Sequence, residues 1–84
     1  VPEVQEITVK LKKAITEAGE AIDKARLLPE RKEEFREELE KVSFVVDTLF
    51  LENNLGELEK SYIYVESLRL NIPHWESAPP YKGE

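Results

Sequence analysis

The side chains that could carry chemistry in this chain are few. There is one histidine, His74, which directly follows Pro73, and there is no cysteine. A nucleophilic site needs a serine or cysteine beside a base, and nothing in the spacing pairs His74 with a serine. We interpret His74 as a ring that packs within the C-terminal segment, and we predict no catalytic residue and no enzyme.

Acidic residues gather between positions 33 and 40 and raise the question of a metal site. Metal sites in helical bundles combine inward carboxylates with Glu-x-x-His pairs, but the one histidine falls outside every predicted helix. The glutamates lie mostly opposite the apolar positions Phe35 and Leu39. We interpret them as a solvated helix face, and we predict no metal and no cofactor.

The alternative function is a small-ligand-binding or enzymatic helical subunit whose site forms between protomers. A dianionic substrate in such a site would need several inward arginines and lysines. Tyr62 is the one evident polar group at a predicted core position. The basic residues lie off the predicted core positions, at Lys10, Lys12, Lys13, Lys24, Arg31, Lys32 and Arg36.

The net charge of −6 disfavours nucleic acids and anionic membranes, because both attract basic patches. Residues 29–52 carry eight acidic and four basic side chains, so most of the negative charge lies there. This segment is either a solvated helix face or a complement to a basic partner. No apolar run approaches the roughly 20 residues of a membrane span. We predict a soluble protein, with the cytoplasm favoured, although the sequence identifies no compartment.

Apolar residues recur at spacings of three and four along the N-terminal third of the chain. This pattern predicts an amphipathic helix at about 3–26. The later positions of the pattern are all alanine, so we expect a neighbouring helix to approach closely there. Gly19 either serves the same close approach or is tolerated on the surface. The predicted core positions are Val4, Ile7, Leu11, Ala14, Ala18, Ala21 and Ala25.

Two prolines and an asparagine mark the limits of two further helices. Pro29 suits the first position of a helix. Asn54 lies three residues before Glu57, which is the spacing of a helix N-cap, and Pro73 is predicted to end the last helix. The predicted helices span about 29–52 and 55–71. Their core positions are Phe35, Leu39, Val42, Val46 and Leu49, and then Leu55, Leu58, Tyr62, Val65, Leu68 and Ile72.

Short connections make consecutive helices antiparallel neighbours. We therefore predict an all-α fold, an antiparallel up-down-up three-helix bundle over residues 1–72. Residues 73–84 contain two adjacent prolines and several rings, and we predict an extended Pro- and aromatic-rich C-terminal tail. An intertwined dimer, with the first helix packed in trans, is the alternative architecture.

Four large apolar residues fall on the outer side of the second and third helices. At about 100° per residue, each lies more than about 100° around its helix from the predicted core positions. These residues are Phe44 and Leu51 on the second helix, and Ile63 and Leu70 on the third. Three explanations compete: Trp75 or Tyr81 of the tail covers them, they form an interface, or they are scattered surface residues.

These observations predict a non-catalytic helical module for protein–protein interaction or oligomerisation. It would act through the outer apolar stripe on the second and third helices. The expected partner is another protein or a second copy in a homodimer, with no nucleic acid and no membrane. The interface candidates are Phe44, Leu51, Ile63, Leu70, Trp75 and Tyr81.

Overall fold

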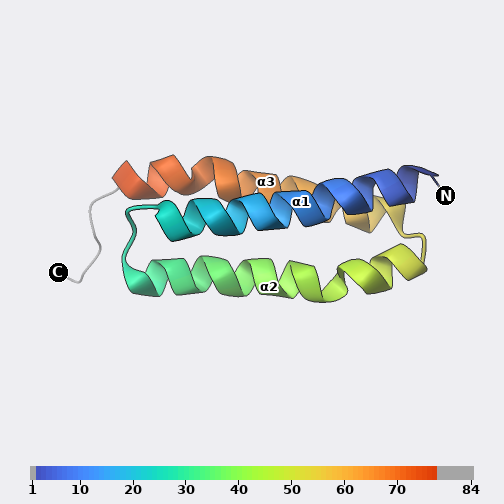
Figure 1. The fold of residues 1–84 in the computed structure, drawn as a ribbon, viewed down its shortest axis with the longest axis horizontal. Coiled ribbons are helices and arrows are strands. Elements are labelled where there is room, and N and C mark those ends of the chain that lie inside the picture. The colour runs from blue at the N-terminus through green and yellow to red at the C-terminus, as the bar shows by residue number, and fades with distance from the viewer. Residues whose placement is uncertain (1, 78–84) are drawn as a thin grey trace.

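The computed structural model describes residues 2–77, which form three helices arranged as a rod of 50 × 18 × 17 Å (Figure 1). The helices are α1 (Pro2–Lys24), α2 (Pro29–Leu51) and α3 (Leu55–Ser77). α2 runs antiparallel to α1 and α3, which run parallel to each other (Figure 1). The predicted all-α up-down-up bundle is therefore confirmed. Within the described residues, no helix combines the length and the apolar character needed to cross a membrane.

The helix boundaries follow from local backbone chemistry. Leu28 is extended, with φ −61° and ψ 147°, and Pro29 begins α2 behind it, because a proline at the first helical position loses no hydrogen bond. Asn53 takes the left-handed conformation, with φ 53°, in the turn after α2. The side-chain Oδ1 of Asn54 accepts a hydrogen bond of 3.2 Å from the Glu57 N–H, so the predicted N-cap of α3 is confirmed.

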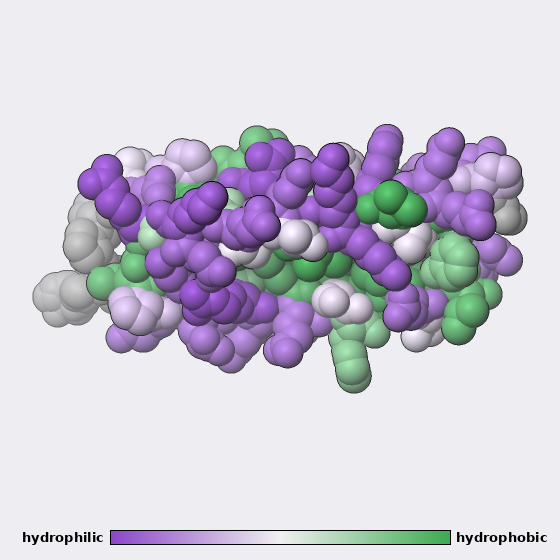
Figure 2. Space-filling model, in the orientation of Figure 1, coloured by the Kyte–Doolittle hydropathy of each residue, from purple (hydrophilic) through white to green (hydrophobic). Residues whose placement is uncertain are grey.

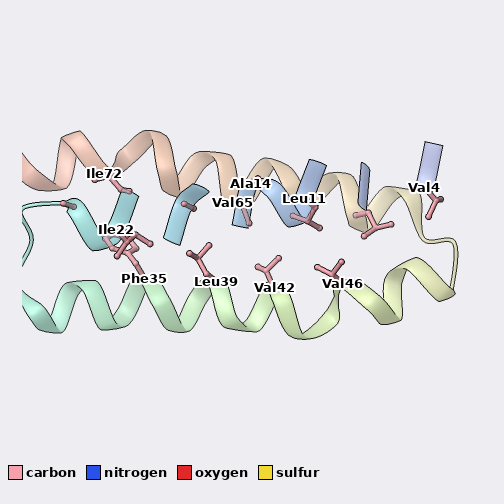
Figure 3. Packing of buried hydrophobic residues seen from close by; sticks show 13 residues of the cluster. Val4, Leu11, Ala14, Ile22, Phe35, Leu39, Val42, Val46, Val65 and Ile72 are labelled. Atoms are coloured by element: carbon pink, nitrogen blue, oxygen red, sulfur yellow. The ribbon is translucent and has the colours of Figure 1, made fainter. Parts of the chain in front are cut away.

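The core is a single column of apolar side chains along the axis of the rod (Figure 3). Most predicted core positions are buried, but six are only partly buried: Ile7, Ala21, Leu49, Leu55, Tyr62 and Leu68. On α1, Thr8 and Ile22 are buried in place of Ile7 and Ala21. The reason is geometric: 18 residues make about five turns of an α-helix, so Ile22 lies in line with Val4, whereas a strict three-four pattern drifts around the helix.

α1 is the helix on which the other two pack. Its most extensive contact is with α3, a smaller one is with α2, and the contact between α2 and α3 is the smallest. The small side chains of Ala14, Ala18 and Ala25 are buried in this core, as expected for a face that lets a neighbouring helix come close. Gly19 has a different explanation, because a Cβ built there meets nothing within 4 Å. Of the two interpretations of Gly19, the structure contradicts close approach by a neighbouring helix and is consistent with a tolerated glycine.

The C-terminal end of α3 differs from the sequence prediction. Pro73 lies inside the helix, which continues to Ser77, so the predicted helix end at Pro73 and the extended conformation of residues 73–77 are wrong. Two contacts explain the extra turn. The ring of Trp75 packs edge-on against Phe35, with ring centroids 6.1 Å apart. The Glu76 carboxylate accepts a 2.8 Å hydrogen bond from the backbone N–H of Arg26. The remainder of the predicted tail lies outside the described residues.

Candidate functional site

Four of the predicted interface residues are exposed in the folded bundle. The exposed fractions are 87% for Phe44, 79% for Leu51, 64% for Ile63 and 66% for Leu70. On the face seen in Figure 2, hydrophobic patches stand among mostly hydrophilic residues. The described residues thus leave large apolar side chains in solvent that the bundle does not use for its own core.

These four residues form two patches rather than one stripe across α2 and α3. The hydroxyl of Tyr64 on α3 donates a 2.6 Å hydrogen bond to Glu38 on α2. This contact shows which sides of α2 and α3 face each other. At about 100° per residue, all four apolar residues lie about 100° or more around their own helices from that contact. The α2 patch is Phe44 and Leu51, and the α3 patch is Ile63 and Leu70.

The α2 patch belongs to a longer row of exposed side chains, which we call the α2 outer seam. Its members recur at spacings of three and four and lie opposite the buried residues of α2. The N-terminal half of the row is acidic and the C-terminal half is mostly apolar. The α2 outer seam consists of Glu30, Glu33, Glu37, Glu40, Phe44, Asp47 and Leu51.

Ion pairs draw the basic residues of α2 away from most of this seam. Arg31 pairs with Glu34 at 2.8 Å, and Arg36 pairs with Asp23 of α1 at 2.9 Å. Lys41 pairs with Glu38 at 3.3 Å. Glu37 lies four residues before Lys41, which is a favourable spacing for an ion pair on a helix. Lys41 nevertheless pairs with Glu38 and not with Glu37. These pairs leave much of the acidic charge of the seam facing solvent.

Two seam residues do have a basic neighbour. Arg36 also approaches Glu33 at 3.7 Å, and Lys12 of α1 pairs with Asp47 at 3.3 Å. Both pairs are largely exposed, so each contributes little to stability. Among residues 2–77, no ion pair involves Glu30, Glu37 or Glu40.

The Tyr64–Glu38 contact changes the titration of both groups. The hydrogen bond from Tyr64, together with the Lys41 ammonium, lowers the pKa of the Glu38 carboxyl. Partial burial, and then the hydrogen bond to Glu38, raises the pKa of Tyr64 to about 12. Both shifts favour a neutral phenol bound to an ionised carboxylate. Sequence reasoning missed this pair, because neither residue lies in a core position.

Trp75 does not cover the exposed patches. Its ring contacts Phe35 near the N-terminal end of α2, and the Arg31 guanidinium lies over it at 4.6 Å from the ring centroid. Phe44 and Leu51 are in the C-terminal half of the same helix. Trp75 therefore closes one end of the bundle, with 37% of its surface exposed. Tyr81, the other predicted covering residue, lies outside the described residues.

The side chains considered above for nucleophilic catalysis and metal binding do not come together in the folded chain. The hydroxyl of Ser77 donates to the His74 carbonyl and not to its imidazole, at 3.0 Å. The His74 ring meets Trp75 edge-on, with centroids 5.9 Å apart, in line with its interpretation as a packing ring. Across residues 2–77, no group of three or more acidic, histidine or cysteine side chains could hold a metal ion.

A shallow depression lies between α1 and α2, near the α2 outer seam. It is lined by residues of both helices, and the Lys12–Asp47 ion pair crosses it. Its polar side chains are mostly exposed, so they are free to bind water instead of a ligand. The lining residues are Lys12, Ile15, Thr16, Ser43, Val46 and Asp47.

The candidate site is thus an exposed surface rather than a pocket. Comparison of the chain with protein-family models, with curated proteins and with solved structures found no significant match.

Proposed function

We propose that this protein is a non-catalytic helical module for protein–protein interaction or oligomerisation. The observation that supports the proposal is the exposure of four large apolar side chains in a chain that already has a complete core. They are Phe44, Leu51, Ile63 and Leu70. Each such side chain would contribute roughly 1.5–3 kcal/mol if a partner buried it fully, and this gain would offset part of the entropy cost of association.

The first test asks whether these side chains serve the fold. Each one is replaced by glutamine, which has nearly the helix propensity of leucine, and stability is measured by urea denaturation at a dilution where the chain is monomeric. Each variant should stay within about 0.5 kcal/mol of wild type, as for other exposed positions. Losses of about 2 kcal/mol or more would show that the side chains stabilise the bundle itself, and the proposal would fail.

The second test separates self-association from binding to another protein. Light scattering gives the mass of the wild type and of Phe44→Glu combined with Ile63→Glu over a range of concentrations. A dimer that dissociates in the double variant supports an oligomerisation module. A monomer supports a module for a different partner. A dimer that persists after all four residues are changed would contradict a role for these patches.

A further inference from the structure

The α2 outer seam has the spacing of a helix-binding face. Its seven positions, from Glu30 to Leu51, follow alternating steps of three and four, which is the pattern by which one helix packs along another. With a rise of 1.5 Å per residue, the seam is about 32 Å long. The buried residues of α2 occupy the opposite side of the helix, and all seven seam residues are exposed among residues 2–77.

The two halves of this seam would bind different kinds of side chain on a partner. Glu30, Glu33, Glu37 and Glu40 present carboxylates in the first half, while Phe44 and Leu51 present apolar surface in the second. The arginines and Lys41 of α2 are paired elsewhere, mostly with residues outside the seam. A partner would have to bring its own positive charge to the first half.

We propose that the α2 outer seam binds an amphipathic helix of another protein that carries lysine or arginine at one end and large apolar residues at the other. This inference rests on the proposed interaction function and names the class of partner. The basic end lies over the glutamates and the apolar end covers Phe44 and Leu51. The opposite polarity of the two ends fixes the direction and register of docking.

A second copy of the chain fits this seam poorly. In a parallel pairing, the glutamates of the two copies would face each other. In an antiparallel pairing, the glutamates of one copy would lie against Phe44 and Leu51 of the other, which removes water from the carboxylates without supplying a counter-charge. Each copy also carries a net charge of −6. Charge complementarity therefore favours a basic partner.

The probes for this proposal are synthetic helical peptides of about 22 residues, the length of the seam. Two peptides place lysines at the facing heptad positions of one half and leucines in the other, in the two possible orders. Two control peptides carry glutamate in place of lysine. Fluorescence anisotropy at low salt should show that one of the lysine peptides binds at least about tenfold more tightly than its glutamate control, and that the difference shrinks at high salt.

Variants of the protein locate the binding site. Glu37→Lys with Glu40→Lys should weaken binding of the lysine peptide at least about tenfold, and so should Phe44→Gln. The matched controls are Glu6→Lys with Glu20→Lys on α1, which change the charge by the same amount at exposed positions away from the seam. Compared at about 0.1 M salt, where the Debye length is about 10 Å, these controls should bind within about threefold of wild type.

Each result decides the proposal. It is overturned if no lysine peptide binds, if charge reversal in the seam has no more effect than in the controls, or if the wild type is a dimer that dissociates on Phe44→Gln. If glutamate peptides bind as well as lysine peptides and Phe44→Gln removes both, the proposed interaction function stands and the basic partner is wrong.

Discussion

The hydroxyl of Tyr64 on α3 donates a 2.6 Å hydrogen bond to the carboxylate of Glu38 on α2, across the least extensive helix contact of the bundle. A charged acceptor makes such a bond stronger than one between neutral groups. The pair therefore ties together the two helices that share the fewest contacts, and its strength depends on pH.

The phenol of Tyr64 should lose its proton at a higher pH than an ordinary tyrosine. Its pKa is raised to about 12 from 10.0, so the stability linked to the neutral phenol is fully present below pH 10 and is lost as the pH rises toward 12. For Glu38 the pKa is lowered, so its contribution is present above the ordinary value of 4.5 and is lost as the pH falls.

A spectrophotometric titration of phenolate absorbance checks this prediction, with Tyr64→Phe used to assign the late step. In Glu38→Gln the step should move only part of the way toward 10.0, because the burial of Tyr64 remains while the carboxylate no longer favours the neutral phenol. An unchanged step in Glu38→Gln would contradict the contribution of Glu38 to the raised pKa.

Replacing Gly19 by alanine should stabilise the protein. Gly19 lies inside α1, and a Cβ there meets nothing within 4 Å. Alanine restricts the unfolded chain and favours the helix, so the free energy of unfolding should rise by about 1 kcal/mol. Urea denaturation measures the change. Ala18→Leu is the contrasting variant, because Ala18 is fully buried and overpacking there should cost about 1–3 kcal/mol.

The turn between α2 and α3 depends on two adjacent asparagines with different roles. Asn53 has φ 53°, so Asn53→Ala should cost about 1 kcal/mol while Asn53→Gly should be tolerated. Asn54 caps α3 through its side chain, so Asn54→Ala should cost about 1 kcal/mol while Asn54→Asp should be tolerated. Thermal denaturation of the four variants distinguishes the roles. The reverse pattern, with Asn53→Gly destabilising, would refute the left-handed turn.

Trp75 should be a stabilising residue. It packs on Phe35 and under Arg31, but 37% of its surface is exposed. Trp75→Ala should therefore cost about 2 kcal/mol, less than a fully buried tryptophan would. Trp75→Phe is the control, because it keeps a ring against Phe35. If Trp75→Ala leaves the urea midpoint unchanged, the last turn of α3 is not docked.

The sequence predicts the three helices well because their apolar spacing and their boundary residues agree. Pro29 and Asn54 mark boundaries that the structure reproduces. Pro73 wrongly predicts the end of the last helix, because Trp75 and Glu76 beyond it make tertiary contacts that hold a further helical turn. These contacts are with Phe35 and Arg26, and local sequence spacing does not reveal them. Such long-range contacts override local helix-ending signals.

For the candidate surface, the sequence predicts which residues point outward but not which of them are neighbours. Helical spacing identifies Phe44 and Ile63 as outward, and both are exposed. Whether they share a face depends on how α2 and α3 are rotated against each other. The Tyr64–Glu38 bond shows that rotation, and helical periodicity alone cannot supply it because it describes one helix at a time.

The dominant contact between α1 and α3 also has a kinetic consequence. These helices are far apart in the chain, and the bond from Arg26 to Glu76 spans 50 residues. The α2–α3 hairpin, which could form early from nearby residues, has the smallest contact of the three pairs. Folding must therefore close a long loop before about half of the contacts between helices can form. We expect a single cooperative transition, with no stable two-helix intermediate.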